Sequence, residues 1–446
     1  MRKIFIFIIL FCCLFLLVGC NTGDRKVKTT EQFLEALETD KNIILKNDLD
    51  FSGIEWTKKR FNGRIEGNGY TIKNISMVEH EATFNIGLFS SAKSIKNVNF
   101  ENIKIKYYGE GEGVGGLIGL MNGTHGIEIE NVKISGSIYA PNATYVGGLV
   151  GYIDSNVSIK ILNSEVNMTI TALDGVGGAV GAVGVGSGYF EGVTNKGEIK
   201  ALDSAAGGIL GAAYKEVSFV NCKNEAPISA LCRVGGIIGS GHISQIKGCV
   251  NGGSITSKIS EDKEALAGGI GGEIKLYDTV SDCTNEGDII GNADYVGGLV
   301  GRLSGEGKVV GSTNTEKVNG ADKVGGIAGK VSEKIQFLNC ENDSEINGVK
   351  CVGGIIGAGY DNVFVSKCSN NTDISAYDYV GGIIGYIDPD YDGTVSYNKN
   401  KGNVTATIHA AGILGVRAGF AKIQDLGTNE NFGKIQGEEV DEIFNW

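Results

Sequence analysis

Hydrophobic and polar positions recur along this chain with an internal period. The string Val-Gly-Gly-Ile-Ile-Gly, or a close variant, begins ten times between Val114 and Val380, and the first glycines of successive copies lie 28 to 33 residues apart. A decayed copy follows at Ala410–Gly415. Self-similarity at such a period indicates a solenoid or a propeller, because each repeat is one unit that buries its apolar face against the next.

A second string, Asn-x-Gly-x-Ile or a variant, lies between these copies. Its asparagines are Asn195, Asn224, Asn251, Asn285, Asn314, Asn342, Asn370, Asn400 and Asn431. Each repeat therefore predicts three short strands: one in the glycine string, one before the asparagine and one after it. A propeller blade needs four strands and about 40 residues. We predict an all-β fold, a right-handed parallel β-helix of about eleven coils over residues 29–420.

The glycine strings resemble GLUG repeats. Upstream, residues Phe61–Asn74 resemble the opening coil found with such repeats, and Asn85–Phe89 resembles a first, divergent copy. This opening is found in the non-catalytic N-terminal region of bacterial IgA-specific metallo-endopeptidases and in many surface proteins. The resemblance covers about residues 30–416 and implies a β-helical surface protein. The histidines do not form the His-Glu-x-x-His pattern of those proteases, so we do not carry that activity over; they are His80, His125, His242 and His409.

The paired glycines and the apolar residues after them predict how the strands pack. Glycine weakens a strand, so its repetition predicts a close approach of backbones rather than a ligand groove. Two apolar residues follow most of these pairs, as in Ile355 and Ile356. Neighbouring strand residues face opposite ways. Either a bend at the glycine hides both columns, which we favour, or one column forms an exposed apolar stripe of the kind that marks binding sites.

The repeat asparagines predict a ladder in which each amide bonds to the copies above and below, helped by the tolerance of asparagine for left-handed backbone. Five cysteines occupy one column, two residues before a repeat asparagine: Cys222, Cys249, Cys283, Cys340 and Cys368. Stacked β-carbons lie about 4.8 Å apart on parallel vectors, whereas a disulfide needs about 3.8 Å and convergent vectors. We therefore expect buried thiols rather than disulfides.

The N-terminus predicts export and lipid anchoring. Arg2 and Lys3 precede an apolar run of 15 residues, Ile4–Val18, which is short for a bilayer span and typical of a signal peptide. The run ends in Leu-Val-Gly-Cys at residues 17–20, which resembles the bacterial lipobox. That resemblance implies a signal peptide at 1–20 and lipidation of Cys20, which would anchor the chain stably in a membrane. We expect a tether at 21–28 and a location in the cell envelope, outside the cytoplasm.

Both ends of a solenoid need caps. Thr29-x-x-Gln32 resembles a capping box and precedes Phe33, Leu34 and Leu37 at helical spacing. This pattern predicts a short capping helix near residues 30–38. At the other end we expect residues 421–446 to cover the last coil, with apolar residues Phe432, Ile443, Phe444 and Trp446.

The sequence contains no recognisable catalytic cluster, metal-ligand set or cofactor motif. Asn371-Thr372-Asp373 and Gly241-His242 faintly echo polygalacturonases, but no Arg-x-Lys element follows. The acidic turn at residues 388–392 is more typical of a solvated loop than of a calcium site. A net charge of −12 argues against a nucleic-acid partner.

We therefore expect a lipid-anchored, non-enzymatic surface module for binding, adhesion or scaffolding, with a glycan or a surface protein as its ligand. The sequence does not identify the ligand-binding residues. The alternative is a β-helical polysaccharide lyase or glycoside hydrolase. That enzyme would need carboxylates, or a carboxylate with Arg or Lys, converging in a groove over neighbouring coils.

Overall fold

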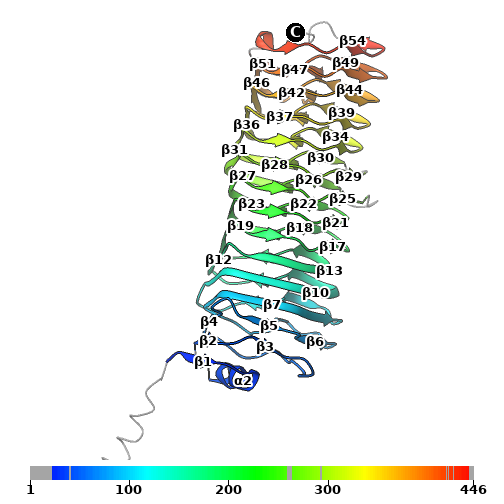
Figure 1. Cartoon of the computed structure of the whole chain (residues 1–446). Coiled ribbons are helices and arrows are strands. Elements are labelled where there is room, and N and C mark those ends of the chain that lie inside the picture. Colours follow the sequence, from blue (N-terminus) through cyan, green and yellow to red (C-terminus); the bar gives the residue numbers. More distant parts are fainter. Residues whose placement is uncertain are drawn as a thin grey trace, which may run out of the picture.

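The computed structural model describes residues 23–39, 42–258, 264–291, 294–417, 419, 421–424 and 426–440. They form a parallel β-solenoid of about 13 turns, stacked along one axis (Figure 1). The predicted fold class is confirmed. The coil count is higher than expected because strands upstream of the first intact glycine string already form coils. The predicted signal peptide at 1–20 and the lipidated Cys20 lie outside the described residues and stay predictions.

Five strand positions recur along the repeats rather than the expected three, because the glycine string spans two strands and the repeat asparagine lies in a short strand of its own. We call these positions A to E in chain order. Position A ends at the first glycine of the string, and B begins just after the bend. Position C leads to a corner, D carries the repeat asparagine, and E carries the isoleucine after it. Each strand pairs in parallel with its equivalent in the next coil: Val234 pairs with Ala267, and Ala267 in turn pairs with Val296.

The strands at position A are β8 (Gly111–Gly115), β18 (Ala205–Gly207), β22 (Arg233–Gly235), β26 (Leu266–Gly268), β30 (Tyr295–Gly297), β34 (Asp322–Gly325), β39 (Lys350–Gly353), β44 (Asp378–Gly381), β49 (His409–Ala411) and β54 (Glu439–Val440). Those at B are β9 (Ile118–Met121), β11 (Val150–Ile153), β14 (Val180–Val183), β35 (Ala328–Val331), β40 (Ile356–Gly359), β45 (Ile384–Ile387) and β50 (Leu414–Arg417). Single strands cover both B and C in four coils: β19 (Leu210–Val220), β23 (Ile238–Lys247), β27 (Gly271–Ser281) and β31 (Val300–Val310).

The separate strands at C are β12 (Ser158–Leu162), β15 (Ser187–Glu191), β36 (Lys334–Leu338), β41 (Phe364–Ser366), β46 (Asp392–Ser396) and β51 (Lys422–Gln424). Those at D are β16 (Thr194–Asn195), β20 (Lys223–Asn224), β24 (Val250–Asn251), β28 (Thr284–Asn285), β32 (Thr313–Asn314), β37 (Glu341–Asn342), β42 (Ser369–Asn370), β47 (Lys399–Asn400) and β52 (Glu430–Asn431). Those at E are β17 (Ile199–Ala201), β21 (Ile228–Ala230), β25 (Ile255–Ser257), β29 (Ile289–Gly291), β33 (Val318–Asn319), β38 (Ile346–Asn347), β43 (Ile374–Ala376), β48 (Val404–Ala406) and β53 (Ile435–Gln436).

The first coils combine short strands with three long ones, β7 (Ser94–Tyr107), β10 (Ile127–Gly147) and β13 (Glu165–Gly177), and have a helical cap. Their other elements are β1 (Arg25–Val27), α2 (Thr30–Glu38), β2 (Ile43–Leu45), β3 (Leu49–Asp50), β4 (Arg64–Glu66), β5 (Thr71–Lys73) and β6 (Ser76–Glu79). A 3₁₀ turn, η1 (Leu426–Thr428), lies in the last coil.

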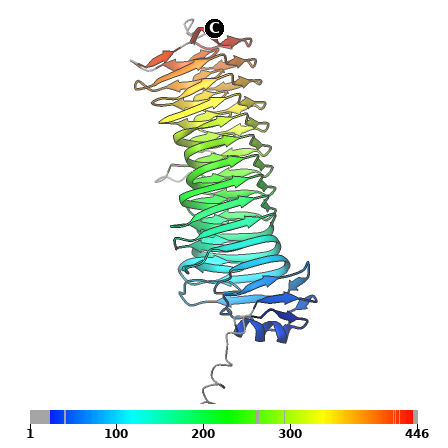
Figure 2. The same ribbon diagram turned by 90° about the vertical axis from the view of Figure 1, so that its left-hand side faces the viewer.

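The predicted capping helix is confirmed as α2, which closes the N-terminal end of the stack (Figures 1 and 2). The Thr29 hydroxyl accepts the Gln32 N–H at 3.4 Å, as expected for an N-cap. The Gln32 side chain accepts the N–H of Lys28 at 2.8 Å, one residue earlier than a capping box requires. The Phe33 ring packs against Phe51 with ring centroids 5.9 Å apart, so the helix covers the core of the first coils.

At the other end, the described part of residues 421–446 forms one further turn of the solenoid. Strands β51 to β54 pair in register with the coil before them. Phe432, which we expected to cover the last coil, is 65% exposed. Ile443, Phe444 and Trp446 lie outside the described residues.

A bend inside the glycine string buries both apolar columns, as favoured above. At Gly298–Leu299 the chain turns, and the N–H groups of Leu299 and Val300 both donate to the carbonyl of Ile327, each at 3.0 Å. Both side chains are buried. The glycines have a packing role: a β-carbon on Gly326 would lie 2.2 Å from the carbonyl oxygen of Gly354. No exposed apolar stripe forms from these columns in the described coils.

The asparagine ladder is confirmed. From Asn195 to Asn431, each side-chain amide donates to the amide oxygen of the next at 2.7 to 2.9 Å. Each of these asparagines also donates to the carbonyl two residues ahead, which closes its own turn. None of these nine asparagines adopts the left-handed backbone that we expected, so that part of the prediction is wrong. That conformation occurs at the C-to-D corner instead, as at Asn221 (φ 51°) and Asn339 (φ 53°).

The cysteine column follows this corner and lines the core. Cys222, Cys249, Cys283, Cys340 and Cys368 are all buried. None of the cysteines in the described ranges forms a disulfide, as the parallel stacking of their side chains predicts.

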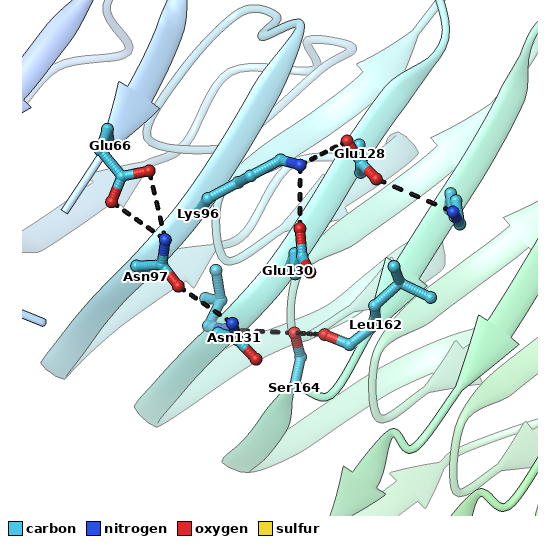
Figure 3. A network of polar contacts seen from close by, with 10 residues as sticks. Glu66, Lys96, Asn97, Glu128, Glu130, Asn131, Leu162 and Ser164 are labelled. Carbon is cyan, nitrogen blue, oxygen red and sulfur yellow. Dashed lines mark hydrogen bonds and ion pairs between the residues drawn. The ribbon is translucent and has the colours of Figure 1, made fainter. Parts of the chain in front are cut away.

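Polar contacts also link the early coils at this corner (Figure 3). The amide of Asn97 donates to Glu66 at 3.0 Å, and that of Asn131 donates to Asn97 at 3.0 Å. Lys96 lies between Glu128 and Glu130, with nitrogen–oxygen distances of 2.6 and 2.9 Å. These bonds tie β4, β7 and β10 together, so we assign them to the stability of the stack.

Candidate ligand-binding groove

An open groove of about 680 Å³ crosses several coils where position B leads into position C. Each of five neighbouring coils contributes one short segment to it. The lining residues are Asn156, Val157, Ser158, Val185, Gly186, Ser187, Tyr214, Lys215, Glu216, His242 and Tyr277. We call this the aromatic groove, because three of its side chains are rings on successive strands, β19, β23 and β27.

Irregular strand pairing positions these rings. The register between β19 and β23 shifts between Ala213 and Val217, and that between β23 and β27 shifts between Ile243 and Gln245. A bulge re-aims the side chains beside it. Here the result is exposure: Tyr214 is 52% exposed and Tyr277 is 41% exposed.

Direct contacts hold the rings in place. The Tyr277 hydroxyl lies 3.0 Å from Nδ1 of His242, and the two ring centroids are 5.8 Å apart. The Tyr214 hydroxyl lies 3.0 Å from that of Tyr145, whose ring packs on Tyr152 at 4.5 Å between centroids. The exposed rings are therefore braced by their neighbours, which reduces the entropy that a ligand would have to remove on binding.

The bracing tyrosines are protonated at neutral pH. Burial, together with the charge of Asp154, raises the pKa of Tyr152 to about 12. Burial also raises the pKa of Tyr145, and its hydrogen bond with Tyr214 adds to the shift. Both phenols therefore keep their donor hydrogens, so the hydroxyl pair formed by Tyr145 and Tyr214 stays intact.

The polar part of the groove is close to neutral. Its charged lining residues are Lys215 and Glu216, and the Glu216 carboxylate accepts a hydrogen bond from Ser244 at 2.6 Å. Ser158, Ser187 and Asn156 add hydroxyl and amide groups. A groove with exposed rings and few charges suits a ligand that has both apolar faces and hydroxyl groups.

A separate ion network lies on the A and B strands of neighbouring coils. Glu273 pairs with Arg233 at 2.5 Å and with Arg302 at 2.9 Å, and Arg302 also pairs with Glu264. Burial acts to raise the pKa of Glu264, but hydrogen bonds from Tyr295 and Arg302 outweigh it and hold this pKa below its ordinary value. Both carboxylates are thus occupied by arginine, and the pKa of Glu264 is lowered as well, so this network suits neither a general acid nor a free nucleophile.

The residues that echoed polygalacturonases do not converge. His242 lies in the aromatic groove, whereas Asn371, Thr372 and Asp373 bond across coils, to Asp343, to the Ser344 carbonyl and to the Asn403 N–H. The strand of His242 is four coils from that preceding Asn371, by the pairings β23–β27–β31–β36–β41, which is about 19 Å along the stack.

Metal chemistry has no evident centre in the described ranges: no group of three or more His, Cys, Asp or Glu side chains is placed to hold an ion. In the acidic turn, the Asp390 N–H donates to the Asp388 carboxylate at 3.2 Å, which is an ordinary loop contact.

Sequence reasoning missed Tyr214 and Tyr277. A signal was present: Tyr214 and His242 both stand three residues after the last glycine of their strings, so a ring occupies one repeat position in two successive copies. Tyr277 stands five residues after its glycine and two residues after Lys275, the partner of His242, so it is a diagonal neighbour of His242 at the register shift between β23 and β27.

Fold and groove together define a parallel β-solenoid with a ring-lined groove across its coils. Comparison with known protein families, curated proteins and solved structures returns no match to this chain. Within the part of the chain that the structure describes, no helix combines the length and apolar character needed to cross a bilayer.

Proposed function

We propose that this chain is a lipid-anchored cell-surface protein that acts as a non-enzymatic binding module. The observation that carries the proposal is the aromatic groove, an open surface with exposed, braced tyrosines. Exposed tyrosines offer large contact area at low entropic cost, and they are enriched at binding surfaces. A solenoid displays such a surface on a stiff, extended support.

The chemistry of the carboxylates supports binding over turnover. Glycoside hydrolysis needs two carboxyl groups flanking one bond, one of them protonated. The aromatic groove has one carboxylate in its lining, Glu216, and the ion network keeps Glu264 and Glu273 paired with arginine. A polysaccharide lyase or glycoside hydrolase is therefore the less favoured function.

The anchoring part of the proposal rests on the sequence. The apolar run, the lipobox-like residues 17–20 and the short polar stretch before β1 fit a chain that is lipidated at Cys20 and exported. The resemblance of the glycine strings to GLUG repeats, which occur in surface proteins, agrees with the same location.

One screen tests binding against catalysis. Every described element follows residue 22, so a chain of residues 21–446 keeps all the described coils together with α2. We would present this chain to arrays of glycans and surface proteins and assay the same glycans for cleavage. The proposal predicts retention of a ligand without turnover. Cleavage of any retained glycan, or the absence of any retained ligand, would refute it.

A further inference from the structure

We propose that the aromatic groove binds a neutral, extended oligosaccharide laid along the stack, with its sugar rings on Tyr214, His242 and Tyr277. This inference rests on the proposed function and names the ligand class. It is carried by the ring spacing, the charge of the lining and the state of the surrounding backbone.

The spacing of the rings follows the coil repeat. Tyr214, His242 and Tyr277 stand on β19, β23 and β27, which lie one above another in the stack (Figure 1). Successive coils are about 4.8 Å apart, so Tyr214 and Tyr277 are separated by about 10 Å along the axis. An extended chain of β-linked hexoses advances by nearly one coil spacing for each sugar. Because His242 pairs with Lys275, Tyr277 lies two residues further along its strand, so a sugar chain that crosses the coils obliquely could place successive sugars over the three rings.

The chemistry of the lining matches a sugar. One face of a pyranose ring presents C–H groups, which pack on the exposed faces of tyrosine. Its rim presents hydroxyl groups, which need both donors and acceptors. The groove supplies donors and acceptors from Asn156, Ser158, Ser187 and Glu216.

The charge balance favours a neutral sugar over an acidic one. The lining holds one lysine and one glutamate, so it lacks the excess positive charge that a polyuronate or sulfated chain would require. The chain as a whole carries −12, which also repels polyanions.

The backbone around the groove disfavours an extended peptide. Peptides that bind sheets usually add a strand at an unpaired edge. Here β23 is paired with β19 on one side and with β27 on the other. A ligand must therefore bind through side chains, as a sugar stacked on rings does.

The test is a titration of residues 21–446 with neutral β-linked hexose oligosaccharides of two to six units, with oligogalacturonate and a mixed peptide library as competing probes. We expect affinity to rise with chain length and to level off once the sugar spans the rings. Tyr214→Ala and Tyr277→Ala should each weaken binding about tenfold or more. Tyr277→Phe should stay within about threefold of wild type, because it keeps the ring.

Tyr377→Ala is the matched control. Tyr377 is 56% exposed and is not part of the groove lining, so its loss should leave binding unchanged. Circular dichroism would establish that each variant keeps its strands.

The outcomes separate the two proposals. Binding of oligogalacturonate or peptide alone, binding insensitive to both alanine variants, or no binding to any probe would overturn the oligosaccharide inference. If a peptide binds and Tyr277→Ala weakens its binding, the ligand is not a sugar, but the proposed binding module is retained. New reducing ends in the sugar would instead overturn the non-enzymatic function.

Discussion

Replacing one internal member of the asparagine ladder tests how the stack is held together. Asn314 accepts from Asn285 at 2.8 Å, and it donates to Asn342 and to the Glu316 carbonyl, each at 2.9 Å. Asn314→Ala removes all three bonds in a fully buried site. At about 1 kcal/mol net for each hydrogen bond, the local loss is about 3 kcal/mol. Buried amide groups left without partners would add to it.

Hydrogen exchange measured by mass spectrometry suits this prediction. A solenoid is stabilised by nearest-neighbour contacts, so unfolding need not be two-state and the effect should stay local. We expect peptides between Asn285 and Asn342 to exchange about 100-fold faster, since each 1.4 kcal/mol is a factor of ten. Peptides of β7 and β10, many coils away, should not change.

A second ladder position supplies the graded control. Asn431 is half-buried and makes two such bonds, with Asn400 and the Gly433 carbonyl. Asn431→Ala should therefore cost about 2 kcal/mol and affect only the last described coils. Equally small increases in exchange rate for the two variants would refute the reasoning. So would an Asn314→Ala variant in which exchange is faster along the whole chain.

Four further predictions concern other positions. Gly326→Ala should destabilise its coil by about 3 kcal/mol in denaturant unfolding, because the new β-carbon would overlap the next coil. Gly123→Ala is the control: a β-carbon there would meet nothing within 4 Å, so the free energy of unfolding should hardly change. Similar losses of stability in the two variants would contradict the packing role of Gly326. Tyr391→Phe removes a buried hydroxyl that donates to a carbonyl at 2.6 Å and should cost about 1 to 2 kcal/mol, and an unchanged midpoint would exclude that bond as a stabiliser. Burial raises the pKa of Cys351 to about 12, so it should resist alkylation at pH 8 until denaturant is added, and rapid native labelling would show that the thiol is accessible. Cys20→Ala should abolish incorporation of a labelled fatty acid in cells, and retained label would place the lipid elsewhere.

The repeating part of the fold was predictable because the same residue types recur at the same positions of every repeat. The asparagine of each copy must bond to its neighbours, and a column such as Cys283 and Cys340 must face the core, so spacing alone gives the register. The bend within the glycine string was one of two predicted arrangements, the other being an exposed apolar stripe. It depends on two N–H groups, of Leu299 and Val300, sharing one carbonyl of the next coil.

The groove was not predictable in this way. Which side chains face outward between B and C depends on where each pair of coils bulges, and bulges reflect small differences in coil length rather than strand alternation. Tyr277, whose hydroxyl contacts His242, lies at such a shift. The last coil likewise differs from expectation, because Phe432 is exposed to solvent while β52 and β53 continue the parallel strand pairing of the stack.

The most direct test of binding without turnover is one calorimetric titration. Residues 21–446 would be titrated with a neutral β-linked hexasaccharide, in the wild type and in the Tyr214→Ala/Tyr277→Ala double variant, and the sugar would be recovered afterwards for mass analysis. We predict saturable binding by the wild type, binding weakened about 100-fold or more in the double variant, and recovery of the intact hexasaccharide. Equal affinities in the two proteins, or recovery of shorter sugars, would contradict a non-enzymatic binding module that acts through this groove.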